Sequence, residues 1–144
     1  MAETIFLDSS FFKGLIDPKD DFYQKASKIW LKLRKESKNL VTSNFIVDET
    51  LTLLRSRCNL ETAIKFRDLL AENSQIIKIV RVTVADEGMA WQWFIKDWSK
   101  LSFTDCVSFA LMKRLGIKRA GRLTSILSEQ GLVSALYKIP AFSR

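Results

Sequence analysis

The chain has 144 residues, 47% of them hydrophobic, with only five Gly and two Pro, so we expect one compact, helix-rich domain rather than a disordered chain. It contains no histidine, which excludes Ser-His-Asp triads, Cys-His pairs, histidine-based RNA cleavage and histidine metal sites. The formal net charge of +7 favours an anionic partner, nucleic acid first, although a generally soluble basic protein would have the same composition.

The first half of the chain alternates between β-type runs and helical patterns. "TIFLDSS" is a short apolar strand that ends at Asp8 and is followed by hydroxyl residues able to cap a helix through "FFKGLI". From Asp20 to Ser37 the apolar residues recur at helical spacing and predict an amphipathic helix. "NLVTS" then predicts a second strand, and "NFIVDETLTLLRSR" a helix that begins near Ser43 or Asn44.

The second half continues this alternation. "LETAIKFRDLLAEN" predicts a helix, "QIIKIVRV" a strand and "VADEGMAWQWFIKDW" another helix. A buried helix is expected from Thr104, a suitable cap, to about Leu115, with Gly116 at its C-terminal end. Short strands near residues 119–123 and 132–136 complete the pattern. Short strands alternating with helices imply a mainly parallel sheet flanked by helices, and hence one α/β domain over residues 1–144.

One predicted helix carries a row of lysines on the side opposite its apolar residues. The row consists of Lys25, Lys28, Lys32 and Lys35. A solvated helix face is the more common explanation for such a row, and an RNA-binding surface is the functional one. The sequence leaves both interpretations open.

Three carboxylates are candidates for a shared site. In an open α/β sheet the functional crevice lies beyond the carboxyl ends of the strands, and Asp8 occupies such an end. Glu49 lies at the edge of the apolar face of its helix, whereas Asp48 lies on the polar side. Asp105 begins the buried helix and aligns with Phe109. Each acid also has a structural explanation: helix capping for Asp8 and Asp105, and a salt bridge for Glu49.

Three such acids in one pocket would repel one another. In a chain without histidine, the simplest neutraliser is a hard divalent cation, Mg²⁺ or Mn²⁺. Such a cation lowers the pKa of bound water and neutralises charge on a phosphate under attack. Together with the basic composition, the acids indicate hydrolysis of phosphodiester bonds.

The motifs resemble those of PIN-domain proteins, and in size and layout those of the VapC-type toxin ribonucleases. The matching segments are "LDSS", "VDETLTLL" and above all "SFTDCVSFALMKRLGI", which is similar to the family's S-x-T-D segment and the helix that follows it. The resemblance covers essentially the whole chain. It implies a three-layer α/β sandwich around a short, mainly parallel sheet, and a Mg²⁺ or Mn²⁺ site built from three or four acids.

The resemblance assigns roles by position. Asp8, Glu49 and Asp105 match the first three acids of the family, and Ser9 and Thr104 match neighbouring hydroxyl positions that could orient a ligand or water. The fourth acid is absent: its position holds Thr124, and the preceding threonine position of the family holds Arg122. A guanidinium there could pair with Asp8 or Asp105 in place of the cation or contact RNA, and Glu129, five residues downstream, is an alternative source of the missing acid.

Three functions follow as hypotheses. The leading one is a metal-dependent endoribonuclease, and the resemblance further implies a homodimer and, for a toxin, an antitoxin protein that blocks the site. The second is a catalytically weakened PIN-fold module that binds RNA or protein, because of Thr124 and Arg122. The third is a structural α/β protein whose acids only cap helices and pair with lysines.

Two further expectations concern the location and the thiols. No apolar run is long enough for a transmembrane helix and the N-terminus lacks signal-peptide regions, so we expect a cytosolic protein. Cys58 and Cys106 have no metal-like spacing, which favours free buried thiols over a disulfide or zinc site.

Overall fold

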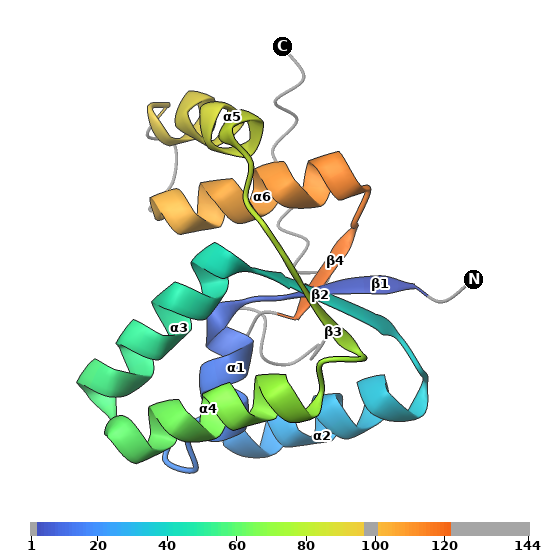
Figure 1. Ribbon diagram of the computed structural model, residues 1–144, viewed down its shortest axis with the longest axis vertical. Helices are drawn as coiled ribbons and strands as arrows, with labels where there is room; N and C mark the ends of the chain where they lie inside the picture. Colours follow the sequence, from blue (N-terminus) through green and yellow to red (C-terminus); the bar gives the residue numbers. More distant parts are fainter. Residues whose placement is uncertain (1–2, 97–100, 122–144) are drawn as a thin grey trace.

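Parallel strands form one sheet in the order β3-β2-β1-β4 (Figure 1). The computed structural model describes residues 3–96 and 101–121. β1 pairs with β2 on one side and with β4 on the other, and its residues Ile5, Phe6 and Leu7 are at most 1% exposed. The apolar run is continuous because helices cover both faces of a parallel sheet. The strands are β1 (Thr4–Leu7), β2 (Asn39–Ser43), β3 (Ile77–Val80) and β4 (Arg119–Gly121).

Helices form a layer on each side of this sheet. Figure 1 shows α1 to α4 on one side and α5 with α6 on the other. The described helices are α1 (Ser9–Ile16), α2 (Tyr23–Lys35), α3 (Asn44–Arg57), α4 (Leu60–Glu72), α5 (Val84–Phe94) and α6 (Phe103–Leu115). This arrangement confirms the predicted sandwich of a short parallel sheet between helices.

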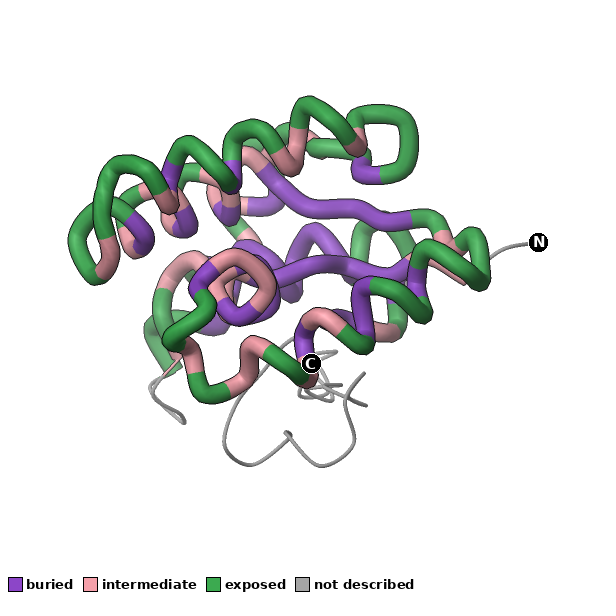
Figure 2. The backbone as a smooth tube through the Cα atoms, turned by 90° about the horizontal axis from the view of Figure 1, so that it is seen from below, coloured by how far each residue is buried: buried purple, intermediate pink, exposed green. Residues whose placement is uncertain are grey.

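The described part of the sandwich contains two apolar clusters. In the larger one, Phe12 of α1 packs on Phe66 of α4 with ring centroids 4.9 Å apart, and Leu33 of α2 is fully buried. The smaller one joins α5 to α6 through Trp93 and Val107. Figure 2 shows buried strands between helices whose outer sides are exposed. In the larger cluster α2 contributes one apolar helix face, as its helical spacing predicted, whereas α6 is buried on all sides from Cys106 to Met112, as expected for a buried helix.

Several predicted helix ends differ from those observed. The helix expected from Asp20 is α2, which begins at Tyr23, because the Asp20 carboxylate accepts a hydrogen bond from the backbone N of Phe22 (2.9 Å) and shapes the preceding turn. At the other end, Ser37 has a φ of 52°, which no helix can continue. α3 begins as predicted, with Ser43 as its cap.

The buried helix α6 begins at Phe103 rather than at Thr104. Its N-cap is Ser102, whose Oγ accepts a hydrogen bond from the backbone N of Asp105, so the expectation that Thr104 caps this helix was wrong. Gly116 ends it as predicted, with a φ of 69° in the left-handed region that favours glycine. Of the two C-terminal strands expected, β4 ends at Gly121, and residues 132–136 lie outside the described residues.

Two remaining expectations can be compared with the structure. Cys58 and Cys106 are free thiols, the first partly buried and the second buried. In the described ranges, no helix has both the length and the apolar character needed to cross a bilayer.

Candidate active site

The carboxyl ends of the strands lie at one edge of the sheet because the strands are parallel. Asp8 directly follows β1, and α3, which carries Glu49, begins directly after β2. α6 leads into β4 through a short turn, so it runs back against the strand direction and its first turn, with Asp105, lies at the same edge (Figure 1). The three candidate acids thus come from three elements that begin or end at the carboxyl edge.

Asp8 occupies the N-cap position of α1, but its carboxylate does not cap the helix. The backbone oxygen of Asp8 accepts hydrogen bonds from the backbone N atoms of Phe11 and Phe12, whereas its side chain makes no capping hydrogen bond. Ser10 Oγ instead donates to Asp8 Oδ2 at 3.2 Å. Asp8 is 6% exposed. Helix capping, the structural explanation for this acid, therefore does not account for the position of its carboxylate.

Glu49 points partly inward, as its place on the helix predicted. Its Oε2 atom is buried, whereas the neighbouring Asp48 is exposed. The periodicity of α3 explains the difference, since successive residues of a helix point about 100° apart. Glu49 therefore places one buried carboxylate oxygen on the inward side of α3.

Asp105 has a structural role of its own. It closes a capping box in which Ser102 Oγ accepts from the backbone N of Asp105 and the backbone N of Ser102 donates to Asp105 Oδ2, both at 3.1 Å. The structural explanation for this acid, helix capping, is thus correct for its Oδ2 atom. The same contact holds the side chain in a defined orientation at the start of α6.

The donor chemistry of the three acids fits a hard divalent cation, which prefers oxygen ligands. Asp8 and Glu49 each place a carboxylate in a largely buried setting, where a counter-charge matters most. However, no group of three or more Asp, Glu or Cys side chains within residues 3–96 and 101–121 is arranged to hold an ion. Asp8, Glu49 and Asp105 therefore share an edge without forming a ready-made coordination group.

The other residues singled out from the sequence lie as follows. Ser9 is the first residue of α1 and Thr104 the second of α6, and both are half-buried. Thr124, Arg122 and the alternative acid Glu129 lie outside the described residues. Sequence reasoning missed Ser10, the hydroxyl that contacts Asp8. Its spacing of two residues from an aspartate at a strand end was the only local signal.

The lysine row on α2 lies on the side of the helix opposite the buried residues Ala26, Ile29 and Leu33. Lys28, Lys32 and Lys35 are exposed, Lys25 is partly buried, and Lys32 lies 3.9 Å from Glu36. The row therefore faces away from the sheet, and its role in RNA binding stays a prediction.

Comparisons with known proteins agree with this fold. The PIN domain family matches residues 5–125. The chain is 32% identical over 130 residues to the 23S rRNA-specific endonuclease VapC20 from two strains of Mycobacterium tuberculosis, CDC 1551 and H37Rv, a match that covers 90% of this chain and 95% of the relative.

A solved structure is similar over the same extent. The crystal structure of Mycobacterium tuberculosis VapC20, described as a sarcin-ricin loop cleaving toxin, superposes with a TM-score of 0.75 and covers 90% of this chain and 96% of that one. The resemblance inferred from the "LDSS" and "SFTDC" segments is thereby confirmed. The chain belongs to the PIN-domain family and is a relative of a VapC endonuclease toxin.

Proposed function

We propose that this protein is a divalent-metal-dependent endoribonuclease and the toxin of a toxin–antitoxin pair. The observation that carries the proposal is the origin of Asp8, Glu49 and Asp105 at one edge of a PIN-type sheet, in a chain 32% identical to a 23S rRNA-specific endonuclease. A structured segment of 23S rRNA, such as the sarcin-ricin loop named for the relative, is accordingly the first substrate to test. We further propose a cytoplasmic homodimer that an antitoxin protein inhibits.

Each acid has a defined task in this proposal. Asp8, Glu49 and Asp105 would hold Mg²⁺ or Mn²⁺, which when bound would acidify a water molecule and offset charge on the scissile phosphate. Ser10 orients the Asp8 carboxylate through its hydroxyl, and the backbone N of Ser102, which any residue at that position supplies, orients the Asp105 carboxylate. Cationic side chains bind the RNA backbone, which is the main source of affinity for a polyanion.

Asp105→Asn tests the site without removing the capping box. The amide of Asn keeps an oxygen that can accept the hydrogen bond from the backbone N of Ser102, but it lacks the negative charge. Ser102→Ala is the matched control, because it removes half of the box and keeps the carboxylate. We expect Asp105→Asn to lose at least 100-fold in Mn²⁺-dependent cleavage of labelled RNA with little change in stability, as is usual for residues that act on the transition state.

The control should show the opposite pattern. Ser102→Ala should lower the free energy of unfolding by about 1 kcal/mol, the usual loss on removing a serine cap, and keep most of the cleavage. Cleavage that resists chelators, or that survives in Asp105→Asn, would refute the metal-dependent mechanism.

A second function has one observation in its favour. Because the described residues contain no ready-made group of three metal ligands, a catalytically weakened module that binds RNA or protein is the alternative. Titration calorimetry with Mn²⁺ alone separates the two functions. Binding that Asp8→Asn abolishes supports the nuclease, whereas RNA binding with no Mn²⁺ binding and no cleavage supports the module.

A further inference from the structure

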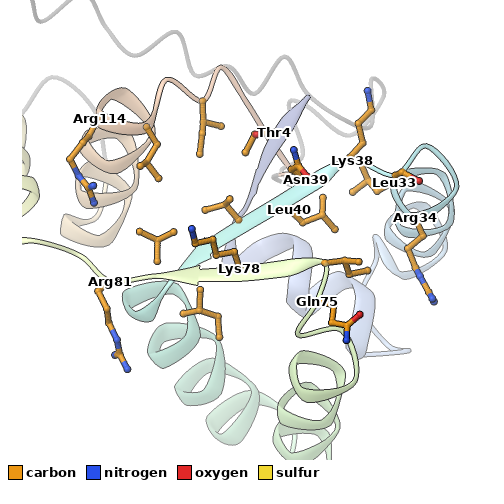
Figure 3. Close-up of a pocket in the computed structure, with 17 residues that line it drawn as sticks. Thr4, Leu33, Arg34, Lys38, Asn39, Leu40, Gln75, Lys78, Arg81 and Arg114 are labelled. Carbon is orange, nitrogen blue, oxygen red and sulfur yellow. The ribbon is translucent and has the colours of Figure 1, made fainter. Parts of the chain in front are cut away.

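A basic groove lies over β2 and β3, between the last turn of α6 and the C-terminal end of α2 (Figure 3). Its volume is about 930 Å³. Among residues 3–96 and 101–121, five cationic side chains and no carboxylate line the groove. We call it the β2–β3 groove, and its cations are Arg34, Lys38, Lys78, Arg81 and Arg114.

These cations differ in how far other groups neutralise them. Arg114 is paired with Asp86, and Lys38 with Glu3. Arg34, Lys78 and Arg81 are exposed and form no ion pair with any residue in the described ranges. The guanidinium of Arg34 lies 5.7 Å from the centroid of the Trp30 ring, which steadies it without removing its charge. Three full positive charges therefore remain available to a ligand.

The groove runs along β3, from the amino ends of the strands to their carboxyl ends. Arg34 and Lys38 lie near the amino ends of the strands, Lys78 lies within β3, and Arg81 follows its last residue. The four residues of β3 span about 13 Å at the usual rise per strand residue. Arg81 thus lies at the same edge of the sheet as the candidate acids.

A side-chain hydrogen bond connects this end of the groove to the candidate site. The backbone N of Val82 donates to Asn44 Oδ1 at 2.8 Å, and Asn44 is the first residue of α3, the helix that carries Glu49. The segment that positions Arg81 is therefore attached to an element of the candidate site. A polymeric ligand bound along the groove would therefore extend toward the candidate site.

We infer that the β2–β3 groove binds the sugar-phosphate backbone of RNA outside the cleavage site. The inference rests on the proposed function, since the bound RNA is taken to be the substrate. Cationic side chains, with no carboxylate among the described lining residues, suit a phosphate backbone, and the exposed Ile76 and Ile79 offer apolar contacts to sugars and bases. A lysine on an edge strand also discourages edge-to-edge pairing, but that explanation does not cover Arg34 and Arg81, which lie outside β3.

The test compares two double variants that remove the same charges. Lys78→Gln/Arg81→Gln alters the groove. Lys65→Gln/Arg55→Gln is the matched control, because both of its residues are exposed, on α4 and α3, and neither lines the groove. Binding of a fluorescent RNA hairpin with a single-stranded loop is measured by anisotropy, with a chelator present and at several salt concentrations.

The groove variant should bind about tenfold more weakly at 0.1 M salt, and its salt slope should fall by about 1.4, since each phosphate contact on a single strand contributes about 0.7. The control variant should lose less than twofold, and both should melt within about 2 °C of the wild-type protein. Equal losses in the two variants would show that only overall charge matters, and would overturn the inference.

Two further arms distinguish the remaining explanations. If polyglutamate displaces the RNA as well as unlabelled RNA does, and also binds the groove variant more weakly, the groove serves an acidic protein partner and the inference is wrong. Cleavage is followed separately on the same hairpin with Mn²⁺. Groove-dependent binding without cleavage would refute the proposed nuclease and keep the groove, whereas cleavage with unchanged binding by the groove variant would refute the groove alone.

Discussion

Arg114 and Asp86 form a bidentate salt bridge that joins the last turn of α6 to the first turn of α5. Nε and Nη2 of Arg114 donate to Oδ1 and Oδ2 of Asp86 at 2.8 and 2.9 Å. Asp86 is 3% exposed and also closes the capping box of α5 with Thr83. The buried carboxylate is thus satisfied by a cation from the other helix of its layer, and α5 and α6 are joined by polar as well as apolar contacts.

Removing the cation should destabilise the fold. In Arg114→Met the aliphatic bulk of the side chain remains, but Asp86 loses two charge-assisted hydrogen bonds in a buried setting. We expect the free energy of unfolding to fall by about 1 to 3 kcal/mol, the usual penalty for a buried polar group that loses its partner. Equilibrium unfolding in urea measures this change in the free energy of unfolding. Arg55→Met, at an exposed position, should change stability by no more than about 0.5 kcal/mol, and an equal change in both would contradict the role of the pair.

The same pair predicts a pH dependence. Burial alone would raise the pKa of Asp86, but the hydrogen bonds from Arg114 and Thr83 hold its pKa below the ordinary value of 3.8. A carboxyl group with a lower pKa in the folded state binds fewer protons there, so its contribution is complete above the unfolded pKa and is lost as the pH falls through the folded pKa. Wild type and Asp86→Asn should therefore differ by a constant amount from about pH 7 to pH 5 and converge below pH 3.8. Unfolding curves at these pH values measure the difference, and a gap that widens in acid would exclude this role.

The hydroxyl beside Asp8 offers a test of positioning. Ser10 donates to Asp8 Oδ2, whereas Ser9, the residue chosen from the motif, makes no side-chain hydrogen bond with the described residues. For the proposed nuclease we expect Ser10→Ala to cut RNA about tenfold more slowly, since a hydrogen bond to a charged group contributes about 1.5 kcal/mol. Ser9→Ala should change the rate less than twofold. The reverse order, in variants of equal melting temperature, would restore Ser9 to the role that the motif implied.

The two thiols should react at different rates. Burial and the nearby Asp17 carboxylate raise the pKa of Cys58, and burial with a smaller effect of Asp105 raises that of Cys106. Because the thiolate is the reactive form, both should react slowly with a disulfide reagent at pH 8. Cys106 is 1% exposed and should react only on unfolding, after the partly buried Cys58. Timed labelling followed by mass spectrometry gives the order, and early modification of Cys106 would show that the layer of α5 and α6 opens in the folded protein.

Local chemistry accounts for much of what could be predicted. Strand and helix order, the cap at Ser43, the end of α6 at Gly116 and the inward side of Glu49 all follow from neighbouring residues, because periodicity and capping act over one or two turns. The error at Thr104 has the same origin. Ser102, Phe103 and Thr104 are adjacent, and two of the three are competent caps, so local rules place the helix start only to within a residue or two.

By itself, the sequence determined the α/β sandwich, the family and three candidate acids, since these depend on short motifs and on their order along the chain. Only the tertiary structure decided that Arg34, Lys78 and Arg81 line one groove, and that Arg114 of α6 pairs with Asp86 of α5. These residues come from segments that are brought together only when the strands pair and the helices pack. Local spacing and propensity do not predict such contacts, because the free energy that stabilises them comes from residues that are distant in the sequence.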